Sequence, residues 1–138
     1  MTLYKIVNDI LEVGRKQPNI NYVGNGDVYT LNSMSNVEYG VFYVTQSNHS
    51  ISEDTVTYNL TLYYIDRVLN DKSNTLQVQS QGMLLLNNII NQYNQIADVE
   101  IDYNINFTTF THRFVDDCAG VFCNVKITTN NEIGICNY

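Results

Sequence analysis

The chain has 138 residues, a mass of 15.8 kDa and a formal net charge of −7, from seven basic and fourteen acidic side chains. Its length suits a single domain spanning residues 1–138, and its 44% of hydrophobic residues excludes a disordered acidic tail. The acidic balance disfavours tight binding to a nucleic-acid backbone, and no apolar run is long enough to predict a membrane span.

The first predicted element is an amphipathic helix at the start of the chain. Its apolar stripe has the spacing i, i+3, i+4, i+7 and i+8 and consists of Leu3, Ile6, Val7, Ile10 and Leu11. This spacing places the stripe on one face of a helix of about three turns. We expect Gly14 to end the helix and Pro18 to stop it from resuming.

A tight turn is predicted at Asn25-Gly26, because this dipeptide is a strong signal for a hairpin. The turn would separate a short extended piece, Asn21–Val23, from a strand at Asp27–Leu31. Gly24-Asn25-Gly26 lacks the further residues of a dinucleotide fingerprint or a phosphate-binding loop. We therefore interpret this glycine-rich segment as a turn and not as a binding motif.

Two longer strands follow, each with alternating side chains. In the first, Val37, Tyr39, Val41 and Tyr43 share one face, and Phe42 and Val44 share the other. In the second, the apolar face consists of Val56, Tyr58, Leu60, Leu62 and Tyr64, and it alternates with Thr57, Asn59, Thr61 and Tyr63. The polar segment between them, Gln46–Asp54, is predicted to be an exposed hairpin loop.

The second half of the chain predicts a longer helix and two closing strands. The helix runs from about Leu76 to Gln95. Its best apolar stripe consists of Met83, Leu86, Ile90 and Tyr93, widened by Leu85 and Ile89. One closing strand has an apolar face of Val99, Ile101, Tyr103, Ile105 and Phe107, and the other of Ala119, Val121, Cys123, Val125 and Ile127. Ile133–Cys136 could add a short last strand.

The element order is α-β-β-β-α-β-β, and each helix has one apolar stripe. The economical fold is a two-layer α+β sandwich, in which both helices cover one face of an antiparallel sheet of about five strands. The opposite face would carry mostly Thr, Asn and Tyr, with few charged residues. Its members in the closing strands are Glu100, Asp102, Asn104, Asn106 and Asn124. Such a face or its edges could contact another subunit. A codon bias toward Asn would give the same composition without any interface, and both interpretations remain open.

The search for chemistry finds no catalytic, cofactor-binding or metal site. Cys118, Cys123 and Cys136 have no zinc-site spacing, and their odd number indicates free thiols in a reducing compartment. His112 and Cys118 flank Asp116-Asp117, which could be interpreted as a Cys-His nucleophile pair with a carboxylate. We favour a polar connection between two strands, because catalytic groups usually converge from separate elements.

The segment Tyr58–Asn74 has the sequence YNLTLYYIDRVLNDKSN and leads through Leu76–Ser80 into the Leu/Ile-rich helix. This pattern resembles the tail-terminator and head–tail connector proteins of tailed bacteriophages, with the small neck and tail ring proteins of crAss-like phages as the nearest likeness. The resemblance covers most of the chain and is most specific between Tyr58 and about Ile90. The family has no short catalytic motif.

The resemblance implies a structural subunit of the virion neck or tail and not an enzyme, assembled in the host cytoplasm. Copies would form a closed ring, six- or twelve-fold, that joins the portal or neck to the tail proteins. Genome DNA would pass through the channel without specific binding, and neither a cofactor nor a membrane is implied. The alternatives are a small intracellular protein-binding module that uses an exposed sheet edge, or an enzyme built on the Cys/His pair.

Candidate interface residues follow from this interpretation. They are Asp66, Arg67 and Asp71 at the end of a strand, His49 and Glu53 in the polar loop, and Asn104 and Asn106 on the outer sheet face. Arg67 could bridge to a neighbouring subunit, or it could pair locally with Asp71, which is worth less than about 1 kcal/mol if exposed. We expect the loop Gln46–Asp54 to become ordered only on assembly.

Overall fold

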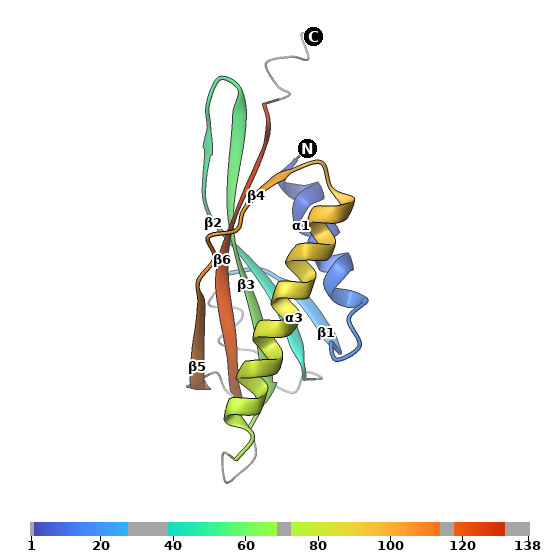
Figure 1. Ribbon diagram of the computed structural model, residues 1–138, viewed down its shortest axis with the longest axis vertical. Helices are drawn as coiled ribbons and strands as arrows, with labels where there is room; N and C mark the ends of the chain where they lie inside the picture. The colour runs from blue at the N-terminus through green and yellow to red at the C-terminus, as the bar shows by residue number, and fades with distance from the viewer. Residues whose placement is uncertain (1, 28–38, 69–72, 114–117, 132–138) are drawn as a thin grey trace.

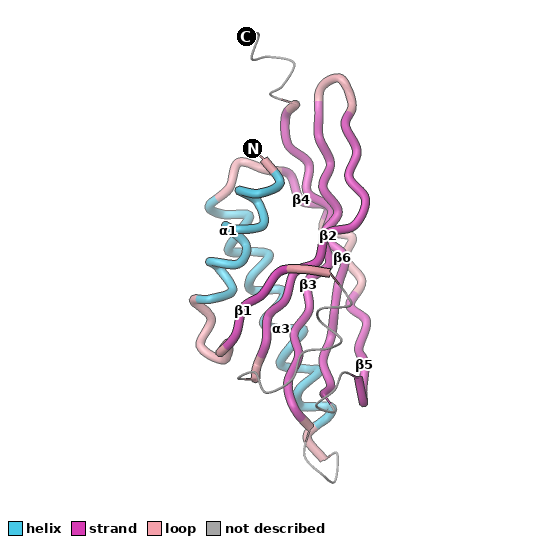
Figure 2. The backbone as a smooth tube through the Cα atoms, turned by 180° about the vertical axis from the view of Figure 1, so that it is seen from behind, coloured by secondary structure: helices cyan, strands magenta, loops and turns pink. Residues whose placement is uncertain are grey.

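A computed structural model of the chain describes residues 2–27, 39–68, 73–113 and 118–131. In this part of the chain, two helices lie on one face of a six-stranded sheet (Figures 1 and 2). The elements are α1 (Leu3–Arg15), β1 (Tyr22–Asn25), β2 (Val41–Ile51), β3 (Thr55–Arg67), α3 (Thr75–Ile96), β4 (Glu100–Asp102), β5 (Phe107–Arg113) and β6 (Cys118–Asn130). The predicted α+β class, the two layers and the order of the elements are confirmed.

Helix α1 forms where the apolar stripe predicts it. Its first turn is capped by Thr2, whose Oγ1 accepts a hydrogen bond from the Lys5 backbone N–H at 3.1 Å. The expectation that Gly14 ends the helix is wrong, because α1 continues to Arg15 and Gly14 is buried within it. A Cβ atom at Gly14 would overlap the ring of Phe42, so the glycine lets α1 approach the sheet closely.

Strand β3 is the centre of the sheet, whose order is β1-β2-β3-β6-β4, with β5 also paired to β6. It pairs with β6 along its full length, from Thr55 opposite Asn130 to Arg67 opposite Cys118. All pairings except one are antiparallel; β1 runs parallel to β2. The sheet is therefore mixed and not wholly antiparallel as predicted. Residues 26–40 separate β1 from β2, which is long enough for the connection that parallel strands require.

The hairpin predicted at Asn25-Gly26 is wrong, because Asn25 is the last residue of β1 and pairs with Val44. The Asn25 Nδ2 group donates hydrogen bonds to the Val44 carbonyl and to Gln46 Oε1, both at 2.8 Å. No glycine among the described residues has the positive φ that this turn would need. The strand expected at Asp27–Leu31 lies outside the described residues apart from Asp27, which is not in a strand.

The polar segment 46–54 is mostly strand and not loop. β2 continues to Ile51, and only residues 52–54 form the turn into β3. The register shifts between Gln46 and His49, so a bulge interrupts the ladder there. β3 starts at Thr55 and pairs in register with Gln46, His49 and Ser50, and backbone hydrogen bonding needs no apolar side chains. The hairpin extends past both helices at the top of Figure 1.

The single strand predicted at 99–107 is two strands, β4 and β5, that pair with the same edge of β6. Asp102 pairs with Lys126, and Phe107 pairs with Cys123. Residues 103–106 therefore lie opposite only residues 124–125, and the excess cannot stay in a regular ladder. Tyr103, which was expected on the apolar face, is 50% exposed in this interruption.

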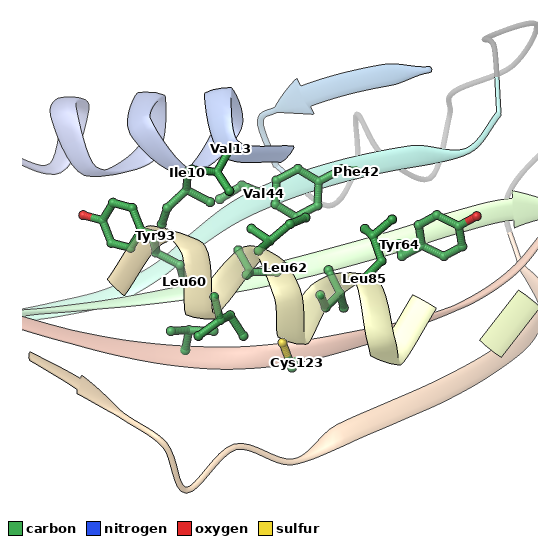
Figure 3. Close-up of a cluster of buried hydrophobic side chains, with 14 of the residues drawn as sticks. Ile10, Val13, Phe42, Val44, Leu60, Leu62, Tyr64, Leu85, Tyr93 and Cys123 are labelled. Carbon is green, nitrogen blue, oxygen red and sulfur yellow. The ribbon is translucent and has the colours of Figure 1, made fainter. Parts of the chain in front are cut away.

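Helix α3 buries a stripe shifted from the predicted one. Its buried residues are Val78, Gly82, Leu85, Leu86, Ile89, Ile90 and Tyr93. Met83 was expected in this stripe, but its exposed fraction is 42%. Gly82 takes the inward position, and a Cβ atom there would lie 2.6 Å from Val121 Cγ1 and 2.7 Å from Tyr64 Cδ2. Figure 3 shows the resulting core, in which Leu62 of β3 and Leu85 of α3 belong to one cluster between sheet and helices.

A second apolar cluster lies on the sheet face that the helices do not cover. It consists of Val41, Tyr43, Tyr63, Ile65, Phe110 and Cys118, all buried, with Tyr39 and Phe122 packed against it. The predicted alternation in β2 is confirmed, since Phe42 and Val44 belong to the helix-side core instead. The expected polar outer face is therefore correct for only one half of the sheet, because the other half is apolar.

Candidate functional site

The polar half of the helix-free face is the region that best matches the predicted interface. Cross-strand pairing aligns Asn59 of β3 with Lys126 of β6, and Lys126 with Asp102 of β4. Next to this row, Thr61 lies opposite Asn124. Because side chains alternate along a strand, these residues point away from the helices, while their neighbours enter the core.

Hydrogen bonds hold this polar surface together. Thr61 Oγ1 donates to Asn124 Oδ1 at 2.7 Å, and Asn59 Nδ2 donates to the Asn48 carbonyl at 2.7 Å. A shallow pocket of about 180 Å³ is lined by Asn59, Asp102, Asn104, Asn124, Val125 and Lys126. Its mixture of amides, one carboxylate and one ammonium offers donors and acceptors to another protein surface. It contains no histidine or thiol that could act as a nucleophile or base.

The arm formed by β2 beyond Gln46 and the start of β3 carries two of the predicted residues. His49 Nδ1 accepts a hydrogen bond from the Asn59 backbone N–H at 3.3 Å. The His49 ring also meets the Tyr58 ring edge-on, with centroids 5.5 Å apart. These contacts give His49 a structural role in the arm. Glu53 lies at the exposed turn, which is closed by the Ser52 N–H donating to the Thr55 carbonyl at 2.8 Å.

Asp66 and Arg67 lie at the opposite end of β3. Asp66 Oδ2 accepts from the Tyr64 hydroxyl at 3.2 Å, and Asp66 Oδ1 accepts from the Arg67 N–H at 2.8 Å. Burial, and secondarily the Asp66 charge, raise the pKa of Tyr64. The Arg67 guanidinium carbon lies 5.9 Å from the centroid of the Tyr39 ring, a cation–π arrangement. Asp71, the predicted local partner of Arg67, lies outside the described residues.

The predicted residues therefore do not form one cluster. The arm and the Asp66-Arg67 pair lie at opposite ends of β3, whose 13 residues span about 40 Å from Thr55 to Arg67 at strand rise. Asn59 hydrogen-bonds to His49 in the arm and also lines the pocket that includes Asn104. Asn106 is exposed in the interruption before β5. An exposed sheet edge was predicted, but not that the outer edges of β2 and of β4 and β5 would be the ones without a partner among the described strands. An unpaired strand edge is a property of the backbone and does not change the alternation of polar and apolar side chains. The sequence pattern therefore cannot show which strands lie at an edge.

The two described cysteines are both buried, on opposite faces of the sheet. Burial raises the pKa of the Cys123 thiol to about 12, so it stays protonated at neutral pH and is a poor nucleophile. Cys118 pairs in register with Arg113, within the apolar cluster of the helix-free face. The described part of the chain does not include the side chains of His112, Asp116, Asp117 and Cys136. The Cys-His pair thus remains a hypothesis.

The described ranges hold neither a candidate metal cluster nor a candidate membrane-spanning helix. Within them, no group of three or more His, Cys, Asp or Glu side chains is placed to hold a metal ion. Neither described helix combines the length and apolar character needed to cross a bilayer.

We expect the buried thiol of Cys123 to make the protein less stable at alkaline pH. Its pKa rises from 9.0 to about 12 on folding, so the folded state keeps a proton that the unfolded state loses. This stabilisation is complete below pH 9 and is lost as the pH rises toward 12, by up to about 1.4 kcal/mol per pH unit. Urea unfolding of wild type and Cys123→Ala between pH 8 and about 11 measures the difference in slope.

Val125→Ala is the matched control, because Val125 is 2% exposed on the same face of β6 but does not titrate. Both alanine variants should be less stable than wild type at pH 8. Only Cys123→Ala should have a flatter dependence on pH above 9. Parallel slopes for all three proteins would contradict the raised thiol pKa.

No family model matches the chain, and no curated protein has a significant match to it.

Proposed function

We propose that this chain is a structural subunit of a phage virion, which forms a closed ring in the neck or tail. The ring joins the portal to the tail proteins around the genome channel. The sequence resemblance over Tyr58–Asn74 supports this proposal, together with one feature of the described sheet. Its two outer edges are exposed, lie on opposite sides and differ in sequence.

The first edge belongs to β2, which pairs with β1 only as far as Val44. From there to Ile51, no described strand covers its outer side. The second edge belongs to β4 and β5, whose only described partner is β6. An exposed edge has unpaired N–H and C=O groups and can pair with a strand from another chain.

Two different edges on one subunit support a head-to-tail contact. If β2 of one copy pairs with the β4–β5 edge of the next, the contact is heterologous and repeats around an axis. Such a series closes into a ring when the rotation divides a full circle, as in a six- or twelve-fold assembly. The net charge of −7 fits a subunit beside DNA that must slide and not adhere, because like charges disfavour backbone binding.

We expect Ile51→Lys to prevent ring assembly while leaving the isolated subunit folded. Ile51 is 66% exposed on the arm, so the substitution should change the free energy of unfolding by less than about 0.5 kcal/mol. A lysine on an edge strand disfavours pairing with another strand. Electron microscopy and native mass spectrometry would follow assembly, alone and with the portal and tail proteins of the same genome.

Asn87→Lys is the matched control, since Asn87 is exposed in the middle of α3, in the helix layer and not on an outer strand of the sheet. Rings or mixed assemblies should form with wild type and Asn87→Lys. If wild type stays monomeric at every concentration and joins neither portal nor tail proteins, the ring proposal fails. Binding of one unrelated protein through the same edge would then favour the binding-module alternative.

A further inference from the structure

One cross-strand row connects the two exposed edges of the sheet. Gln46 of β2 lies opposite Leu60 of β3, and Leu60 lies opposite Val125 of β6. On the other side of β6, the antiparallel ladder with β4 ends one residue before this row. The next residue, Tyr103, therefore stands level with Val125. Gln46 and Tyr103 thus lie at the same height on opposite edges of one sheet.

Tyr103 belongs to the helix side of its edge. Ile101 and Ile105 pack against the core under the helices. Asp102 and Asn104 line the polar pocket on the helix-free face. This alternation places Tyr103 on the same side as the two isoleucines. It is a large apolar side chain that is 50% exposed, so the described part of its own chain covers only half of it.

A pocket lies at the same height beside the opposite edge. It has a volume of about 400 Å³ and is lined by Leu3, Tyr4, Val7, Asn8, Asn25 and Gln46. Its α1 wall is apolar, because Val7 belongs to the helix-side core and Leu3 packs against it. Gln46 brings the pocket to the row that ends at Tyr103, just past the last residue of β2 that pairs with β1. The pocket therefore joins an apolar wall to an uncovered strand edge.

The pocket fits a tyrosine side chain in size and in polarity. A water molecule takes about 30 Å³, so a volume of about 400 Å³ leaves room for an aromatic ring. The hydroxyl of a buried tyrosine needs a hydrogen-bond partner. Asn25 Nδ2 donates to Gln46 Oε1 at 2.8 Å, and nothing in the described ranges accepts from Gln46 Nε2. This amide group can donate to a phenol oxygen at the polar end of the pocket.

We propose that Tyr103 of each copy inserts into this pocket of the next copy. The inference rests on the proposed ring and names the side chain that joins neighbouring copies. β2 and β4 run in opposite directions, because each step of the order β2-β3-β6-β4 is antiparallel. A rotation about an axis parallel to the strands preserves their direction and height. It brings β4 of one copy antiparallel to β2 of the next, with Tyr103 level with Gln46 on the helix side of both sheets.

The net charge of −7 on each copy opposes any contact between copies at long range. None of the described residues that line the pocket is charged, so this repulsion arises outside the contact. Salt screens it, and at about 1 M the Debye length falls to about 3 Å. The apolar insertion of Tyr103 does not depend on charge and persists under these conditions.

Sedimentation velocity at about 1 M salt measures the concentration at which half of the chain has assembled. Tyr103→Ser should raise this concentration at least about tenfold, because the contact loses a buried aromatic side chain. Tyr103→Phe keeps the ring and should raise it less. Leu84→Ser is the control; it also removes a large exposed side chain, but from the outer side of α3 and not from an edge, and should leave assembly unchanged.

A mixture of two variants gives the sharpest result. Asn8→Trp fills the pocket from an exposed position on α1 and retains Tyr103. Tyr103→Ser retains an open pocket. Neither variant should assemble alone. At equal concentrations they should form a heterodimer and nothing larger, because each pair has one intact contact and no second one that extends the series.

The outcomes separate this contact from the ring itself. Rings of Tyr103→Ser at the concentration that wild type needs would overturn the insertion and leave the proposed function standing. Heterodimers in the mixture, with only open chains from wild type, would support the insertion and contradict closure. If wild type and the mixture both stay monomeric, alone and with the portal and tail proteins, the insertion and the ring are both wrong.

Discussion

We expect Gly120→Ala to unfold the protein or to destabilise it by at least about 3 kcal/mol, a large part of the total stability of a domain of this size. Gly120 lies in β6 where this strand pairs with the centre of the sheet. A Cβ atom there would overlap the backbone carbonyl oxygen of Tyr64 and lie 2.9 Å from Phe110 Cζ. The backbone of β3 cannot move away without breaking its pairing with β6.

Gly82→Ala provides the matched comparison, because it also adds one methyl group at a close approach. Its Cβ atom would meet only side chains, Val121 and Tyr64, which can adjust by rotating. We expect a cost of about 1–3 kcal/mol, smaller than that of Gly120→Ala. Urea denaturation followed by circular dichroism would measure both variants. Equal stability of Gly120→Ala and wild type would show that β3 and β6 are not paired as described.

Leu86→Ala is the second substitution with a large expected effect, a loss of about 2–5 kcal/mol. Leu86 is fully buried, at 0% exposure, in the core between α3 and the sheet. Truncation removes apolar contacts and leaves a cavity that the surrounding strands can fill only in part. The free energy of unfolding should fall at constant m-value, because the unfolded state exposes nearly the same surface.

Leu84→Ala is the control on the same helix, two residues away and 63% exposed. The Leu84→Ala substitution should change the free energy of unfolding by less than about 0.5 kcal/mol. The pair of variants thus tests which side of α3 faces the sheet. Similar losses for both would mean that the helix is rotated from its described position.

The two helices and the central strand β3 could be predicted from the sequence because their periodicity is local. Leu3 to Leu11 and Val56 to Tyr64 each repeat apolar residues at the spacing of one secondary structure. Each stripe must be buried, and one sheet with two helices offers only one economical two-layer solution. Part of the candidate interface could be predicted in the same way, because Asn59 and Asn124 alternate with core residues and must point outward.

Other features depend on what lies beside a residue in space. Gly14 has the sequence pattern of a helix terminator, but it lies inside α1 under the ring of Phe42. Gly82, and not Met83, faces the sheet, because the sheet lies too close to α3 there for a side chain. The polar residues of the arm became strand because β3 offers them backbone partners.

By itself, the sequence determined the α+β class, the position of both helices along the chain and the alternating faces of the central strands, since these follow from spacing along the chain. Only the tertiary structure decided the parallel position of β1, the division of β4 from β5 and which side of α3 faces the sheet. The physical reason is that hydrogen bonding in a sheet and close packing are non-local. Both depend on which strand lies alongside and on how closely it approaches. The spacing of apolar residues along the chain encodes neither the neighbouring strand nor its distance.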